Sequence, residues 1–259
     1  MKVLDTFAGI GGFSFASHKR GWETVAFIEK DKECHKVLRK QFPNVPIYDD
    51  VTTFDGTSFQ GAIDIITGGW PCQDNSNANQ SSTRRSGLDG ERSGLFTHFA
   101  RIIREVRPRY VVAENTPDIL VANGGRDFNR ILSELASMGF DAEWGVLRAS
   151  DIGSPHHRAR LYLVAYTRRE HFQTIHLSQR WRDVRAQTHA RSRVLVGTTV
   201  SVGGAWRPVP DVYRMADGVS AELHRPSALI RHRLLGNSIV PQIAEHLFNF
   251  IQLREDMFK

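Results

Sequence analysis

Short apolar runs alternate with helical patterns from Met1 to about Ala165. The runs are rich in β-branched residues and are bounded by glycines and polar residues, which predicts strands. They lie near Val3–Thr6, Thr24–Ile28, Ile63–Thr67, Tyr110–Ala113, Ala142–Val146 and Leu161–Ala165. Strands that alternate with helices are typical of βαβ units. We therefore expect an α/β, Rossmann-like doubly wound fold with a mostly parallel sheet.

The segments between these strands carry apolar residues at helical spacing. In Phe96–Val106 they recur every three or four residues, which places them on one face of a helix. Asp127–Met138 follows the same rule, and Gly139 stands where a glycine commonly ends a helix. A last helix is predicted over Ser238–Leu253. We expect these helices to cover the sheet.

Two segments interrupt the alternation. Asp74–Arg92 is almost wholly polar, and long loops of this kind are usually functional or disordered. From Tyr166 to about Trp206 the apolar residues follow neither the strand period nor the helix period clearly, while arginine, histidine and glutamine accumulate. We therefore predict a main domain over residues 1–165, a small inserted lobe over 166–232, and a C-terminal helix over 233–259 that returns to the main domain.

The positive charge of the chain is concentrated in the inserted lobe. The net charge is +6, but Tyr166–Arg233 alone holds 12 arginines and no lysine against 5 acidic residues, a net +7. The rest of the chain therefore carries −1. Because the planar fork of arginine suits phosphates and base edges, this favours a lobe that binds a polyanion. The alternative is a solvated, arginine-rich surface without a function.

Cysteine usage and the amino terminus indicate the compartment. The two cysteines, Cys34 and Cys72, form no CxxC pair, which argues against a disulfide scaffold and against a cysteine-based zinc site. The amino terminus enters a strand directly and lacks the pattern of a signal peptide. No apolar run approaches the roughly 20 residues that span a bilayer. We expect a soluble, cytoplasmic protein without a metal site or a membrane contact.

Cys72 is the first candidate for chemistry. It follows the predicted strand Ile63–Thr67 within the segment GGWPCQ at 68–73, so it projects from the carboxyl end of a central strand. In open α/β sheets this edge carries ligands and reacting groups, which makes Cys72 a candidate nucleophile. The alternative is a small buried hydrophobic residue.

A glycine-rich turn indicates a nucleoside-type cofactor. The first strand runs into DTFAGIGGF at 5–13, where glycines allow the backbone to approach a ligand. Glu29 ends the second strand twenty residues after Gly9, where it can accept hydrogen bonds from a ribose, and Asp50 is placed to meet an adenine amino group. The order GxGG, rather than GxGxxG, counts against NAD.

Three charged residues join the thiol at the same edge. Glu114 ends the strand predicted beside the one that delivers Cys72, and Arg158 and Arg160 open the strand Leu161–Ala165. Singly, each has an ordinary explanation as a solvated or salt-bridged residue. Together they place a thiol, a carboxyl group and two guanidinium groups beside the cofactor turn.

In this context the ordered motifs resemble those of the cytosine-C5 DNA methyltransferases: DTFAGIGGF, Glu29, GGWPCQ, ENT at 114–116, HHRAR at 156–160 and GNSIVPQIAEHL at 236–247. The resemblance covers roughly residues 1–165 and 233–253. It implies that Cys72 is the nucleophile and that Glu114, Arg158 and Arg160 hold the cytosine. It implies an S-adenosyl-L-methionine site lined by Phe7, Gly9, Ile10, Glu29, Asp50, Pro71, Leu95 and Asn237.

The same resemblance implies the partners and the reaction. The fold would be that of a class I methyltransferase, with a catalytic and cofactor-binding domain over 1–165 and target recognition in the lobe over 166–232. The substrate would be a cytosine flipped out of double-stranded DNA, and a cognate restriction endonuclease and the oligomeric state are left open. Three residues depart from the family pattern and concern loop packing: Asn75, Thr116 and His156.

The chemistry agrees with this expectation. Carbon 5 of cytosine is a poor nucleophile until a thiolate adds at carbon 6, and neighbouring arginines favour the thiolate form. A protonated Glu114 would donate to the ring nitrogen N3. The alternatives are a methyltransferase that acts on tRNA, a DNA-binding relative without catalysis, and a nicotinamide-dependent Rossmann enzyme.

Overall fold

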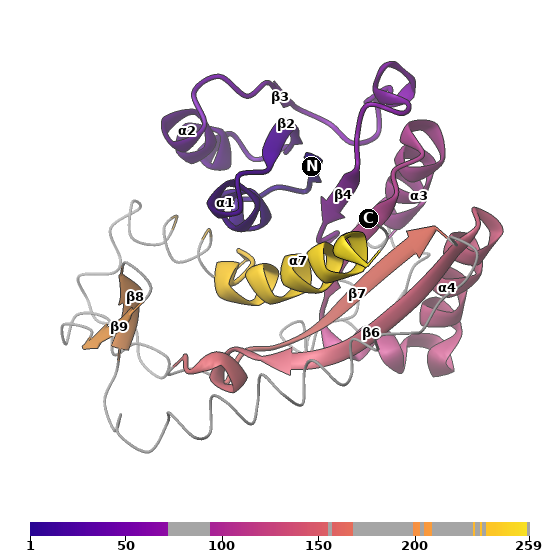
Figure 1. The fold of residues 1–259 in the computed structure, drawn as a ribbon. Coiled ribbons are helices and arrows are strands. Elements are labelled where there is room, and N and C mark those ends of the chain that lie inside the picture. The colour runs from indigo at the N-terminus through magenta and orange to yellow at the C-terminus, as the bar shows by residue number, and fades with distance from the viewer. Residues whose placement is uncertain are drawn as a thin grey trace.

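The computed structural model describes residues 1–71, 94–154, 157–167, 199–202, 205–208, 230, 234 and 237–257. Its centre is a seven-stranded sheet in the order β3-β2-β1-β4-β5-β7-β6 (Figure 1). The strands are β1 Lys2–Thr6, β2 Glu23–Ile28, β3 Ile47–Tyr48, β4 Ile65–Gly68, β5 Tyr110–Asn115, β6 Phe140–Arg148 and β7 Ala159–Thr167. β7 runs antiparallel to β5 and β6, and the other described pairings of this sheet are parallel, so the prediction of a mostly parallel sheet is confirmed.

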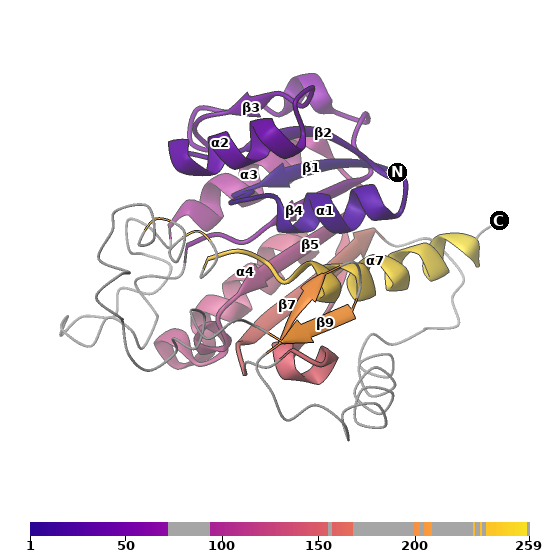
Figure 2. The same ribbon diagram turned by 90° about the vertical axis from the view of Figure 1, so that its left-hand side faces the viewer.

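Helices cover both faces of this sheet. They are α1 Gly12–Lys19, α2 Lys32–Gln41, α3 Leu95–Val106, α4 Arg126–Ser137 and α7 Pro241–Asp256. Short 3-10 turns are η1 Thr57–Phe59, η3 Pro117–Leu120, η4 Ala122–Gly125 and η5 Ala149–Ile152. α1, α2 and α7 lie on the face seen in front in Figure 2, while α3 and α4 lie behind. A separate antiparallel pair consists of β8 Thr199–Val202 and β9 Ala205–Pro208.

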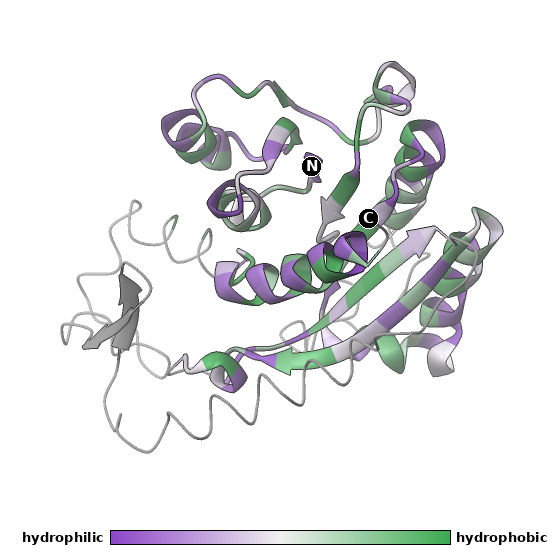
Figure 3. Ribbon diagram, in the orientation of Figure 1, coloured by the Kyte–Doolittle hydropathy of each residue, from purple (hydrophilic) through white to green (hydrophobic). Residues whose placement is uncertain are grey.

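The core follows from the two-residue period of the strands. Val3 belongs to the hydrophobic cluster shared with α1 and α7, whereas the next residue, Leu4, belongs to the cluster shared with α3 and α4. Successive side chains of a strand point to opposite faces, so one strand supplies both layers. Figure 3 shows the corresponding hydrophobic residues on β4 and in the middle of β7. The central strands β1, β4 and β5 are therefore buried on both sides, and polar groups for chemistry are expected at the strand ends.

The helix ends show which sequence signals predicted the helix boundaries correctly. α4 ends at Ser137, and Gly139, two residues later, has a φ of 86°. This left-handed conformation is typical of the glycine that follows a helix end, so the predicted glycine stop is confirmed. The predicted start of the last helix at Ser238 is wrong, because α7 begins at Pro241. Proline is suited to the first position of a helix and restricts the residue before it to extended backbone.

Several predictions lie outside the described residues or remain untested. Cys72, the loop Asp74–Arg92 and most of the lobe over 166–232 lie outside them. β7 extends to Thr167, two residues beyond the predicted domain boundary. Among the described helices, none is long and apolar enough to cross a membrane. The division into domains stays a prediction.

Candidate active site

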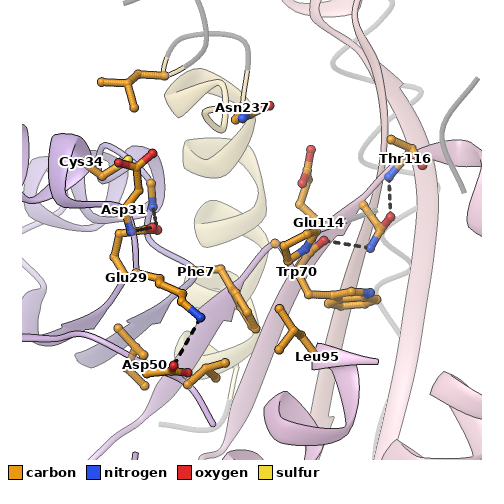
Figure 4. Close-up of a pocket in the computed structure, with 18 of the residues that line it drawn as sticks. Phe7, Glu29, Asp31, Cys34, Asp50, Trp70, Leu95, Glu114, Thr116 and Asn237 are labelled. Atoms are coloured by element: carbon orange, nitrogen blue, oxygen red, sulfur yellow. Dashed lines mark hydrogen bonds and ion pairs between the residues drawn. The ribbon is translucent and has the colours of Figure 1, made fainter. Parts of the chain in front are cut away.

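A cavity of about 310 Å³ crosses the carboxyl edge of the sheet. Its wall follows the strand order: Asp50 comes after β3, Glu29 after β2, Phe7 after β1, Trp70 after β4 and Glu114 from the end of β5. Figure 4 shows these residues across the pocket, with Asn237 above them. Because β7 is antiparallel, its start also reaches this edge. The remaining lining residues are Gly9, Ile28, Lys30, Asp31, Cys34, Val51, Thr52, Gly69, Pro71, Leu95, Asn115, Thr116, Arg158, Arg160 and Leu234.

Glu29 fixes the glycine turn at one end of the pocket. Its Oε2 accepts a hydrogen bond from the backbone N–H of Gly9 at 2.7 Å, and its Oε1 accepts one from the N–H of Asp31 at 2.8 Å. Gly9 has a φ of 55°, a left-handed conformation that glycine adopts without strain. Each carboxylate oxygen keeps a second lone pair, so Glu29 can still accept from a ligand.

Asp50 supplies a second carboxylate at the same end. Its Oδ1 accepts from the N–H of Thr52 at 2.8 Å, and its Oδ2 lies 3.5 Å from Nζ of Lys30. The backbone hydrogen bond from Thr52 lowers the pKa of Asp50, and Lys30 lowers it further. Asp50 is therefore an acceptor at neutral pH.

Helix α3 holds the loop that follows β3. Nη1 of Arg101 donates to the carbonyl of Phe54 at 2.8 Å, and Nη2 donates to the carbonyl of Val51 at 2.9 Å. Nη1 also contacts Oε1 of Glu105 at 2.7 Å, while Oε2 of Glu105 accepts from the N–H of Gly56 at 2.9 Å. These contacts attach Val51, a pocket residue, to α3, with which it shares a hydrophobic cluster.

The C-terminal segment reaches the pocket through close packing on the glycine turn. A Cβ placed on Gly12 would lie 2.8 Å from the Cβ and the carbonyl oxygen of Ile239. Gly12 therefore makes room for protein backbone, whereas the sequence led us to assign the glycines of this turn to a ligand. The contact brings Asn237, two residues before Ile239, to the rim of the cavity.

Glu114 occupies the other end of the pocket. Its side chain is 12% exposed, and Nε of Arg160 lies 3.0 Å from its Oε1. Burial raises the pKa of Glu114 above its usual range, although the charges of Arg160 and Arg158 act to lower it. A raised pKa favours the protonated form of the carboxyl group, which can donate a hydrogen bond.

Arg158 and Asn115 connect this end to neighbouring segments. Nη2 of Arg158 donates to the carbonyl of Ser238 at 3.0 Å, which joins the start of β7 to the C-terminal segment. Nδ2 of Asn115 donates to the carbonyl of Trp70 at 3.3 Å, and its Oδ1 accepts from the N–H of Thr116 at 2.8 Å. Asn115 therefore fixes the backbone two residues before Cys72.

Asp5 lies beneath the glycine turn as a fully buried acid. Its oxygens accept from the hydroxyl of Thr67 at 2.6 Å and from the hydroxyl of Ser14 at 2.7 Å. Burial raises the pKa of Asp5 to about 7 in spite of these bonds. Asp5 thus ties β1 to β4 and to α1.

The structure brings together most of the residues predicted from sequence. All the described candidates line the cavity except Ile10, which is half-buried in the turn and is not among the lining residues. Cys72 lies outside the described residues and follows Pro71, which lines the cavity. The roles assigned to these residues stay predictions.

Sequence reasoning missed Asp31, Val51 and Thr52, together with Asn115 and Thr116. Each lies within three residues of a predicted one, so neighbouring positions at strand ends were the available signal.

Comparison with known proteins gives a family match. The family model described as C-5 cytosine-specific DNA methylase matches residues 1–198. The type II methyltransferases M2.BsuMI of Bacillus subtilis and M1.ScrFI of Lactococcus lactis are each 34% identical to this chain over 169 residues. These alignments cover 64% and 65% of this chain and 42% of each relative. The chain thus spans about two fifths of the length of these relatives.

Solved structures share the fold. A putative DNA modification methyltransferase encoded within an Escherichia coli prophage aligns with a TM-score of 0.53 and 26% identity, over 64% of this chain and 47% of that one. The Dnmt2 methyltransferase of S. pombe aligns with a TM-score of 0.56 and 17% identity, over 71% of this chain and 54% of that one. The second likeness concerns the fold alone.

Proposed function

This chain belongs to the C-5 cytosine-specific DNA methylase family, and from that premise we propose that it transfers a methyl group from S-adenosyl-L-methionine to carbon 5 of cytosine in double-stranded DNA. One observation carries the proposal. A single pocket holds two carboxylates, Glu29 and Asp50, at one end and the pair of Glu114 and Arg160 at the other. Pro71, the residue before Cys72 in the sequence, also lines it.

The lining of the pocket fits the cofactor by its chemistry. Glu29 and Asp50 offer acceptors for the hydroxyl and amino groups of an adenosine, while Phe7, Trp70 and Leu95 supply apolar surface for its rings. S-adenosyl-L-methionine, when bound, supplies an electrophilic methyl group carried by a sulfonium. The carboxylates and the indole ring suit a ligand that carries positive charge.

The residues at the other end would activate the cytosine. The thiolate of Cys72 adds to carbon 6, and a protonated Glu114 donates to N3 to neutralise the charge that develops on the ring. Arg160 holds Glu114 in place through the contact at 3.0 Å. Once carbon 5 is methylated, loss of its proton expels the thiolate and restores the ring.

Access to the base requires that it leave the duplex, which costs a few kcal/mol. We propose that the loop Asp74–Arg92 closes over the flipped base. We also propose that residues 166–232, with their arginine excess, form the lobe that recognises the target sequence. A cognate restriction endonuclease would be the functional partner in a restriction–modification system.

The experiment is to express the chain in a host that lacks cytosine methylation and to sequence the host DNA after bisulfite conversion. We expect 5-methylcytosine at one short sequence. In vitro, transfer of labelled methyl groups to duplex DNA and to tRNA should be compared. Methylation of tRNA but not DNA would contradict the proposal and favour an RNA substrate. Binding of NAD but not S-adenosyl-L-methionine in a calorimeter would contradict the cofactor.

A further inference from the structure

A fully buried histidine, His35 on α2, contacts the backbone of the cofactor end of the pocket. Its Nε2 lies 2.6 Å from the backbone carbonyl oxygen of Glu29. A carbonyl oxygen can only accept, so Nε2 carries the hydrogen and donates it. His35 therefore holds the main chain of a residue that lines the cavity.

The other ring nitrogen of His35 argues against a role in packing alone. Nδ1 is buried and has no hydrogen-bond partner in the described part of the chain. Oδ1 of Asp49 lies 3.8 Å from it, beyond hydrogen-bond distance, and Asp49 is itself paired with Lys32 at 2.6 Å. A buried nitrogen without a partner is unfavourable, and an apolar side chain would fill the same space without that cost. The contact of Nε2 with Glu29 is what a histidine adds here.

Glu29 lies where β2 ends, and the sheet supports its backbone on one side only. Its N–H donates to the carbonyl of Tyr48 at 2.9 Å. The described pairing of β2 with β3 ends at Ile28 and Tyr48, so it supplies no further ladder hydrogen bond for the carbonyl of Glu29. His35 supplies this donor from α2 instead. A side chain thus replaces the backbone donor that a longer β3 would have offered.

The orientation of the Glu29 carboxylate depends on this backbone. Oε2 accepts from the N–H of Gly9 and Oε1 from the N–H of Asp31, so the tip of the side chain is held at two points. Asp31 is the N-cap of α2, and residues 29–31 form the short connection from β2 to that helix. Without the donor at His35 this connection could rotate. The acceptor lone pairs of Glu29 would then be misaligned with a ligand, and misaligned hydrogen bonds are weak.

We propose that His35 is a positioning residue for the cofactor, which acts through Glu29 and touches no ligand itself. The inference rests on the proposed function, in which Glu29 accepts hydrogen bonds from S-adenosyl-L-methionine. His35 is not among the residues that line the cavity, although the preceding residue, Cys34, is. Any effect of His35 on binding must therefore pass through Glu29, and it should vanish when the Glu29 carboxylate is altered.

The test compares His35→Asn with His35→Gln in calorimetric titrations of the full chain with S-adenosyl-L-methionine. The amide nitrogen of glutamine reaches about as far as Nε2 of histidine, whereas the shorter asparagine reaches only as far as Nδ1. His35→Asn should raise the cofactor Kd about 3- to 10-fold, the range expected for one lost hydrogen bond. The KM for the cofactor should rise by the same factor, and kcat at saturating cofactor should stay within about twofold. His35→Gln should restore most of the affinity.

A double-mutant cycle distinguishes positioning from a general loosening of the fold. Glu29→Gln alone should weaken cofactor binding, and the addition of His35→Asn should then change the Kd by less than about twofold. Effects of the two changes that multiply independently overturn the inference. The control is Leu135→Ala on α4, which is buried and does not line the cavity. It should lower the Tm and leave the cofactor Kd unchanged. A His35→Asn variant that behaves like this control also overturns the inference.

A measurement on the wild-type chain applies even if the variants do not fold. Nitrogen-15 NMR of the histidine rings reports which ring nitrogen carries the hydrogen. We expect the ring of His35 to carry it on Nε2 both with and without S-adenosyl-L-methionine, and a ring protonated on Nδ1 alone overturns the inference. A wild-type protein that binds S-adenosyl-L-methionine but methylates no DNA refutes the proposed function instead. An unchanged cofactor Kd in His35→Asn overturns the inference and leaves the proposed function intact.

Discussion

Replacement of Arg101 by methionine tests whether α3 shapes the cofactor end of the pocket. The change removes the donors to the carbonyls of Val51 and Phe54 and the contact with Glu105, but keeps most of the apolar stem. Hydrogen bonds that involve a charged group contribute about 1.5–3 kcal/mol each. The Arg101 side chain is 33% exposed, so solvent screens these bonds and the lower end applies.

We therefore expect a cost of about 1–2 kcal/mol in ordering the loop, which corresponds to a roughly 5- to 30-fold weaker Kd for S-adenosyl-L-methionine. Calorimetric titration of the purified protein measures this directly. Because Arg101 contacts no predicted catalytic residue, kcat at saturating cofactor should stay within twofold. Arg101→Lys, which cannot bridge two carbonyls with the same fork, should give an intermediate Kd.

The matched control is Arg104→Met on the same helix. Arg104 is 56% exposed and pairs with Glu134 at 3.0 Å, away from the loop. It should leave the cofactor Kd unchanged. If Arg101→Met binds the cofactor as tightly as the wild type while its Tm falls, the hydrogen bonds of Arg101 stabilise the fold only, and their proposed effect on cofactor binding is refuted.

Three further predictions concern the reaction and the fold. Cys72→Ala should abolish methyl transfer and leave the cofactor Kd within a few-fold. Wild-type protein should form a denaturant-stable adduct with DNA that contains 5-fluorocytosine. If no adduct forms on a sequence that the protein methylates, the covalent route is contradicted. Glu114→Gln keeps an N–H donor but cannot transfer a proton, so we expect kcat to fall about tenfold. Because burial raises the pKa of Glu114, any loss of initial rate with rising pH that depends on Glu114 should disappear in this variant, and a loss that persists unchanged belongs to another group. Because the pKa of Asp5 is raised from 3.8 to about 7 on folding, its contribution to the unfolding free energy is present in full below about pH 4 and is lost as the pH rises through 7. Asp5→Asn should reduce the stability difference between pH 5 and pH 8 by about 2–4 kcal/mol in urea titrations, and an unchanged difference would contradict the pKa.

The centre of the sheet was predictable because strands such as β4 and β5 are buried on both faces. Runs such as Tyr110–Ala113 need no tertiary information to be recognised. β3 was not predicted as a strand, because a two-residue strand carries no period. The carboxyl ends of parallel strands lie at the same edge of a sheet, so the position of the pocket could be predicted from the strand order. Glu29, Asp50 and Glu114 were therefore predicted as site residues from the sequence.

The residues that support the site were not predictable. Arg101 lies on the exposed side of an amphipathic helix, and nothing near it in sequence indicates acceptors at Val51 and Phe54, about fifty positions earlier. The role of Gly12 was misassigned because its close neighbour, Ile239, is at the other end of the chain. Contacts between distant segments leave no local pattern.

The direction of β7 constrains how the arginine-rich segment can be exchanged or removed. β7 starts beside the pocket, and its end at Thr167 lies past the first residue of β5, Tyr110, at the opposite edge of the sheet. The chain is back at the pocket by Asn237. The two ends of the intervening segment are therefore separated by the height of the sheet, roughly 30 Å for a nine-residue strand. If this segment is removed, its two ends cannot be joined by a tight turn. A connection of about nine extended residues is needed to lead the chain from Thr167 back to Asn237. Chimeras with relatives should accordingly be joined within β7 and before Asn237, at two separate places on the scaffold rather than at a single loop.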